Sequence, residues 1–288
     1  MLDKPTGAIE LREIARVATI APAAFQSRFL RREQPVVIED LAAQWPARNK
    51  WSPQFFRDSY GDRPVKVYDA SFAEPGDNYL ASLRTVSLAE YIDRVVHSDA
   101  DLRMFLYDLV SEIPELQEDI LIPDIADGFS RRFIFMFFGC RGSLTPMHYD
   151  IDMSHVFHTQ LHGRKRVMLF APDQSRNLYR HPCTVRSYVD LDNPDLDRFP
   201  RLAELRGWKT VLNPGDTLFI PSGYWHHVLY LDGGYAVSLR CRHERIVRRA
   251  QGVANVLAAT LVDWTMNRLF GERWFRWKEN GADRRAAR

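Results

Sequence analysis

The strongest chemical signal in the sequence is a candidate metal site in residues 144–150 (LTPMHYD). Alternate side chains of a β-strand point to the same face, so His148 and Asp150 would share a face and Tyr149 would point away from it. Two imidazoles and one carboxylate form the site that binds Fe(II) and leaves positions open for a cosubstrate and O₂. The second imidazole is available in residues 221–227 (PSGYWHH), where His226 directly follows a tryptophan.

A His-x-Asp pair alone is weak support for a metal site, because a single strand histidine is usually a structural residue. The chain contains a second such pair, His97 and Asp99, at the polar end of a predicted helix. The pair His148 and Asp150 becomes more specific through its combination with His226 and with Lys165, which follows a Gly163 turn signal.

The secondary structure predicted to position these residues differs between the N-terminal and the central part of the chain. Residues 1–130 are expected to be mixed α/β, with strands near 34–38 and 64–68 and with helices that begin after the N-cap residues Ser52 and Ser87. Residues 131–242 contain short apolar runs separated by Gly and Pro turn signals, as in a β-sandwich or barrel. The apolar runs are 133–138, 166–170, 217–220 and 236–239.

Residues 243–288 show helical periodicity. Apolar residues recur at spacings of three and four and form one stripe along a long helix: Ile246, Ala250, Val253, Leu257, Leu261 and Trp264. Either the barrel of the same chain or a second subunit must cover such a stripe. We expect it to be a homodimer interface.

Composition indicates a folded globular protein and excludes several classes. Hydrophobic residues make up 45% and charged residues 26% of the 288 residues, which argues against disorder. Neither a membrane-spanning apolar run nor a secretory signal is visible. The three cysteines contain no C-x-x-C pair, so we expect neither a disulfide framework nor a cysteine zinc site. We therefore expect a soluble, cytoplasmic protein without a membrane partner.

The net charge of +2 conceals a basic C-terminal region. Residues 240–288 carry 12 Lys and Arg against 5 Asp and Glu. Such a region can contact nucleic acid, although a solvated helix surface is the simpler interpretation.

Several motifs occur in the order found in one enzyme family. Residues 145–150 (TPMHYD), 161–166 (LHGRKR), 192–195 (DNPD) and 214–226 follow one another within residues 35–242. This arrangement resembles the JmjC/cupin-like Fe(II)- and 2-oxoglutarate-dependent hydroxylases, and in particular the factor-inhibiting-HIF asparaginyl hydroxylase group. The resemblance implies a mainly β fold with flanking helices, built on a double-stranded β-helix (jelly-roll, cupin-like) core at residues 131–242.

The resemblance also assigns roles to single residues. It implies that His148, Asp150 and His226 bind the iron, while His227 points to the opposite face. Thr145 and Lys165 would hold the distal carboxylate of 2-oxoglutarate, because a buried carboxylate requires a charge partner. The alternatives are a solvated hairpin lysine and ordinary strand propensity of threonine.

Further polar residues are expected around the cosubstrate pocket. His158 and Arg240 occupy positions where relatives often have asparagine, and Tyr107 lies where relatives place a polar pocket residue. A buried strand tyrosine is the equal alternative for Tyr107. Asp152 and His155 would tune the metal site, bind substrate, or be plain loop residues.

The implied reaction is oxidative decarboxylation of 2-oxoglutarate to succinate and CO₂, with O₂ as the second cosubstrate, coupled to hydroxylation of a C–H bond. The preferred substrate is a side chain of a protein or peptide. A small metabolite or a modified tRNA stays open as an alternative substrate. A metal-binding cupin of another reaction type and an inactive scaffold also stay open.

Overall fold

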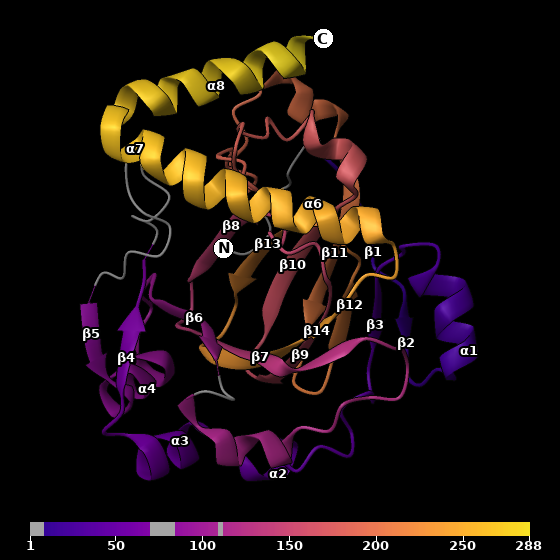
Figure 1. Cartoon of the computed structure of the whole chain (residues 1–288). Helices are drawn as coiled ribbons and strands as arrows, with labels where there is room; N and C mark the ends of the chain where they lie inside the picture. Colours follow the sequence, from indigo (N-terminus) through magenta and orange to yellow (C-terminus); the bar gives the residue numbers. More distant parts are fainter. Residues whose placement is uncertain (1–8, 70–83, 109–111) are drawn as a thin grey trace.

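Two facing β-sheets form the centre of the computed structural model, which describes residues 9–69, 84–108 and 112–288 (Figure 1). The five-stranded sheet has the order β1 (Glu10–Glu13), β11 (Arg206–Leu212), β10 (Lys165–Phe170), β13 (Trp225–Tyr230), β8 (Leu144–His148). The seven-stranded sheet has the order β2 (Arg16–Val17), β3 (Val36–Ile38), β12 (Thr217–Ile220), β9 (His155–His162), β14 (Gly234–Cys241), β7 (Phe129–Gly139), β6 (Arg103–Asp108). This arrangement confirms the predicted jelly-roll core.

Strand alternation divides the residues of the large sheet between two environments. On β14, Tyr235, Val237 and Leu239 pack into the main hydrophobic cluster with the N-terminal helices. The residues between them point to the opposite face, where Ser238 contacts a side chain of β9 and Arg240 contacts the loop that follows β8. The interior of the barrel therefore receives polar groups from a strand that is buried along its whole length.

The N-terminal region covers the outer face of the large sheet and extends both sheets. Its helical segments are α1 (Pro22–Phe25) with a π-helical turn (Gln26–Leu30), α2 (Ala47–Lys50), α3 (Pro53–Tyr60) and α4 (Leu88–His97). The predicted caps are present, since Ser52 accepts from the Phe55 amide and Ser87 from the Glu90 amide. β4 (Pro64–Val67) and β5 (Arg84–Ser87) pair antiparallel as a separate two-stranded sheet, and short 3₁₀ turns occupy Pro114–Asp119, Pro172–Ser175 and Pro200–Glu204.

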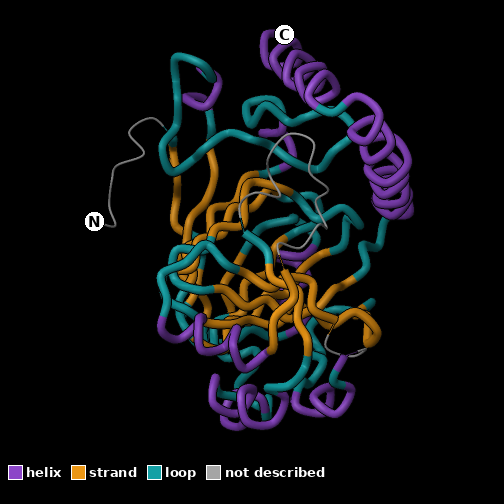
Figure 2. Tube along the Cα trace, turned by 90° about the vertical axis from the view of Figure 1, so that its left-hand side faces the viewer, coloured by secondary structure: helices purple, strands orange, loops and turns teal. Residues whose placement is uncertain are grey.

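The C-terminal region forms a helical hairpin across one end of the barrel (Figures 1 and 2). The first arm runs through α6 (Ile246–Leu257), a π-helical segment (Ala258–Asp263) and α7 (Trp264–Phe270), so the predicted long helix is confirmed with a π insertion. Gly271 adopts a φ of 47° and lets α8 (Glu272–Ala287) turn back.

The two arms of this hairpin differ in how they are covered. On α8, Trp274 and Ala282 are buried and Lys278 donates to Asp263 at 2.7 Å, so this helix packs on its own chain. The apolar stripe of the first arm stays in contact with solvent, with exposed fractions of 62% at Val253 and 63% at Leu261. Among the residues that the structure describes, no helix combines the length and apolar character that a bilayer crossing requires.

Candidate metal and cosubstrate site

The three predicted metal ligands meet where β8 and β13 pair. His148 ends β8, Asp150 follows two residues later, and His226 is the second residue of β13, directly opposite His148. One potential ligand atom from each residue lies within 4.8 Å of the others. His226 Nε2 is 3.9 Å from Asp150 Oδ2, and the two imidazole centroids are 4.1 Å apart.

Both imidazoles are held in the form that a metal needs. Burial, reinforced by His226, lowers the pKa of His148 to about 3, and burial also lowers the pKa of His226. Each ring is therefore neutral near pH 7. The Nδ1 of His148 lies 2.8 Å from the Pro146 carbonyl oxygen, and the Nδ1 of His226 lies 3.1 Å from that of Tyr224. These carbonyls accept from Nδ1–H, which leaves each Nε2 lone pair free for a metal.

Asp150 supplies the anionic ligand. Burial disfavours its ionised form, but Arg240 and the two imidazoles outweigh that effect and hold the pKa of Asp150 at about 2. The Arg240 guanidinium forms an ion pair with Asp150, with Nη1 2.7 Å from Oδ1. Two neutral nitrogens and one carboxylate fit Fe(II) with open coordination positions.

Lys165 lies in the same barrel and has the environment of an anion-binding residue. It begins β10 opposite Tyr230 of β13, is 1% exposed, and holds its Nζ 4.3 Å from the centroid of the Tyr230 ring. Burial lowers the pKa of Lys165 well below its usual value. No carboxylate in the described part of the chain pairs with it. Because a buried cation is costly without an anion, the site fits the distal carboxylate of 2-oxoglutarate.

His158 connects this lysine to β14. Its Nε2 is 3.2 Å from Lys165 Nζ and its Nδ1 is 2.7 Å from Ser238 Oγ. Burial and the nearby Lys165 lower the pKa of His158 well below its usual value, so the ring is neutral. Ser238 was missed by the sequence analysis, which assigned this neighbourhood to Arg240 two residues later. The cross-strand pairing of His158 with Ser238 is the signal that could have found it.

The other predicted residues divide between the site and its surroundings. Thr145 lies half-buried on β8 opposite Val228, and its contact with the cosubstrate stays a prediction. Tyr107 does not join the site: it pairs with Met136 and packs on the N-terminal cluster, on the face of the large sheet opposite His158. Burial raises the pKa of Tyr107 to about 12.

Residues flanking the ligands have separate structural partners. His227 points away from His226 and places Nε2 3.5 Å from Asp192 Oδ2. In the second His-x-Asp pair, Asp99 forms an exposed ion pair with Arg141. His155 accepts a hydrogen bond from the Ser222 amide at 3.1 Å and so holds the turn before β13. Its ring also stacks on His243.

The loop after β8 is held between the barrel and α6. Asn255 donates to the Ile151 carbonyl at 3.3 Å, and a Cβ on Gly252 would lie 2.4 Å from the Asp152 carbonyl oxygen, so only glycine permits this approach. A cavity of about 340 Å³ opens beside this contact. It is lined by Asp152 and Arg242 and by five residues of α6, which are Arg249, Gly252, Val253, Val256 and Leu257.

This fold and site define a metal-binding protein of the cupin type. Residues 22–244 match the cupin-like domain family, and the chain belongs to that family. It is similar to lysine-specific demethylase 8 of Danio rerio, with 32% identity over 242 residues that cover 79% of this chain and 58% of the relative. Lysine-specific demethylase JMJ30 of Arabidopsis thaliana is 32% identical over 71% of this chain and 49% of its own length.

A third relative bears a different kind of name. The tRNA wybutosine-synthesizing protein 5 of Gallus gallus is 27% identical over 76% of this chain and 74% of its own length. The chain spans about half the length of the two demethylases. The comparisons confirm the JmjC/cupin-like oxygenase family, whose enzymes use Fe(II), 2-oxoglutarate and O₂.

Proposed function

We propose that this protein is an Fe(II)- and 2-oxoglutarate-dependent dioxygenase that hydroxylates a C–H bond of a protein or peptide side chain. One observation carries the proposal: a fully buried lysine, for which the described residues offer no carboxylate partner, shares the barrel with a His-Asp-His cluster. A metal-binding cupin of another reaction type has no need of such a lysine.

The residues of the chain divide the work between metal and cosubstrate. His148, Asp150 and His226 would hold Fe(II), and Lys165, with Thr145, would bind the distal carboxylate of 2-oxoglutarate. When bound, the iron with its cosubstrates supplies the oxidising chemistry. The protein provides two neutral imidazoles and an ionised carboxylate, which lie close together where β8 pairs with β13.

Anaerobic spectroscopy tests this proposal directly. Addition of Fe(II) and then 2-oxoglutarate under nitrogen is expected to produce a visible metal-to-ligand charge-transfer band in the wild type. The band should be absent from His226→Ala at the same concentrations. A wild type that binds both components without the band would contradict the proposal.

The cavity beside Asp152 supports a macromolecular substrate. It lies next to the loop that carries Asp150, and its walls combine the apolar Val253 and Leu257 with the cationic Arg242 and Arg249. Peptides that place an apolar side chain beside an acidic one complement these walls. The names of two relatives as lysine demethylases agree with a protein substrate.

The wybutosine relative favours tRNA as a second candidate substrate. Incubation of the iron-loaded enzyme with 2-oxoglutarate and either a peptide library or total tRNA separates the two candidates. We expect a mass gain of one oxygen atom in peptides only. A gain in tRNA nucleosides, with tRNA binding that weakens as salt rises, would instead identify RNA as the substrate.

We also propose a homodimer through the first arm of the C-terminal hairpin and a cytoplasmic location. Leu261, Trp264 and Leu269 are each about half exposed or more in the single chain, which favours a subunit contact. The three cysteines are unpaired, in agreement with a reducing compartment.

A further inference from the structure

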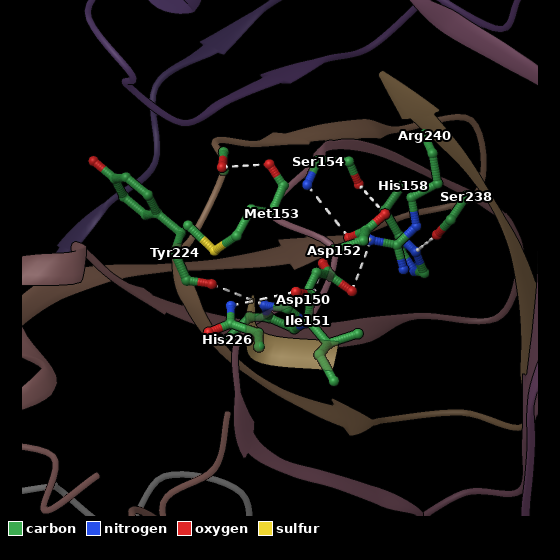
Figure 3. Close-up of polar contacts among 12 residues, drawn as sticks. Asp150, Ile151, Asp152, Met153, Ser154, His158, Tyr224, His226, Ser238 and Arg240 are labelled. Atoms are coloured by element: carbon green, nitrogen blue, oxygen red, sulfur yellow. Dashed lines mark hydrogen bonds and ion pairs between the residues drawn. The ribbon is translucent and has the colours of Figure 1, made fainter. Parts of the chain in front are cut away.

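The two carboxylate oxygens of Asp150 have different partners (Figure 3). Oδ1 lies 2.7 Å from Arg240 Nη1, whereas Oδ2 lies 3.9 Å from His226 Nε2, on the side of the imidazoles. No other ion pair or side-chain hydrogen bond to Oδ1 occurs among the described residues. The guanidinium therefore determines which oxygen faces the two histidines.

Arg240 is itself held firmly in this position. Arg240 is the penultimate residue of β14 and is 8% exposed. Its guanidinium lies 5.9 Å from the centroid of the Phe135 ring. A second carboxylate of the same loop, Asp152 Oδ1, lies 3.8 Å from Nη1. Asp152 is fixed in turn by the Ser154 hydroxyl at 2.8 Å. Arg240 thus bridges a rigid strand and the loop that carries the metal ligand.

We propose that Arg240 is a positioning residue that occupies Asp150 Oδ1 and thereby reserves Oδ2 for the metal, an inference that rests on the proposed function. A carboxylate without this restraint can rotate and offer both oxygens to one cation. Bidentate binding would occupy one more of the positions that an oxygenase needs for its cosubstrate and O₂. Arg240 then preserves an open position.

A simple charge effect makes the opposite prediction for metal affinity. Arg240 is a cation beside a cation site, so if it were only a neighbouring charge, its removal would strengthen metal binding. If it positions Asp150, its removal weakens binding, as loss of a partner that orients a ligand does, by about 10- to 100-fold. The direction of the change therefore distinguishes the two roles.

Mn(II) binding measured by electron paramagnetic resonance, without 2-oxoglutarate, makes this distinction independently of turnover. Arg240→Met removes the charge and keeps most of the volume, and we expect it to lower Mn(II) affinity by about 10- to 100-fold. Arg240→Lys should recover part of the loss, since one ammonium donor can replace the single Nη1 contact. Arg245→Met, at an exposed cation five residues along the chain that does not line the cavity, is the matched control and should leave Mn(II) affinity unchanged.

The absorption spectrum of the Co(II)-loaded protein provides the second readout, because its intensity reports coordination number. We expect it to differ between wild type and Arg240→Met and to return toward wild type in Arg240→Lys. Circular dichroism verifies folding, and Arg240→Gln replaces Arg240→Met if the latter does not fold. Equal or tighter Mn(II) binding with an unchanged Co(II) spectrum in the neutral variant would overturn this inference alone. A wild type that binds no Mn(II) would overturn the proposed function as well.

Discussion

Replacement of Lys165 by methionine is the sharpest test of the cosubstrate site. Methionine fills most of the same volume but removes the ammonium group that lies beside His158 and the Tyr230 ring. The distal carboxylate of 2-oxoglutarate would then be buried without a charge partner. Breaking a buried pair in this way costs about 3–5 kcal/mol, which corresponds to roughly two to four powers of ten in affinity.

The environment of Lys165 moves the expected loss toward the lower end of this range. Its pKa is lowered by burial, so part of the binding free energy of the anion is used to keep the lysine protonated. We therefore expect the affinity for 2-oxoglutarate to fall by about a hundredfold to a thousandfold. Lys165→Arg should recover only part of it, because the guanidinium differs in shape and reach.

The assay is calorimetric titration of 2-oxoglutarate into Mn(II)-loaded protein under nitrogen. Lys278→Met is the matched control, since Lys278 is equally buried but pairs with Asp263 in the C-terminal hairpin. A 2-oxo acid of the same length without the distal carboxylate should bind wild type and Lys165→Met alike. Unchanged 2-oxoglutarate affinity in Lys165→Met would refute the assigned role of this lysine.

Three further predictions concern the metal, the oligomer and pH. His226→Ala should abolish Mn(II) binding while His227→Ala, whose ring faces Asp192, should retain it; equal losses would mean that the wrong histidine was chosen. Leu261→Arg with Leu269→Arg should convert a dimer into a folded monomer by light scattering, and a wild type that is monomeric at micromolar concentration would remove the interface. The melting temperature of the metal-free protein, followed by circular dichroism, should fall as pH drops below about 6.5. In this range the histidines of the unfolded chain bind protons, whereas the buried histidines of the folded protein stay neutral down to about pH 3–4, so protonation favours the unfolded state. These buried histidines are His148, His155 and His181, with pKa values of about 3, and His227, with a pKa of about 4. A melting temperature that is flat between pH 7 and pH 4 would contradict this reasoning.

The fold and the metal cluster were accessible from sequence because each depends on short-range rules. Strand alternation predicts that His148 and Asp150 share a face, and the two side chains do meet although β8 ends at His148. The Ser52 and Ser87 caps follow from local helix chemistry. The π insertion in the C-terminal helix was not predicted, since no residue type within 258–263 marks it.

The polar interior depends on a register that the sequence does not reveal. A register shift of one residue would move every side chain of β14 to the other face of the sheet. A shift of two residues would keep the faces but exchange the neighbours of Ser238 and Arg240. The pairing of β14 with β9 opposes Ser238 to His158 and leaves Arg240 beside the loop after β8. Ser238 therefore contacts the histidine beside Lys165, and Arg240 contacts Asp150, while the predicted contact of Arg240 with the cosubstrate stays a prediction.

This placement gives β14 a role in coupling the two halves of the site. Ser238 and Arg240 are two residues apart on one face of a buried strand, so their separation is fixed by the backbone. Ser238 orients His158 against Lys165, while Arg240 orients Asp150 against the histidines. Any displacement of β14 must move both contacts together. β14 therefore links the contact beside Lys165 to the contact beside Asp150, while the pairing of β10 with β13 and of β13 with β8 fixes the spacing between Lys165 and the two histidines.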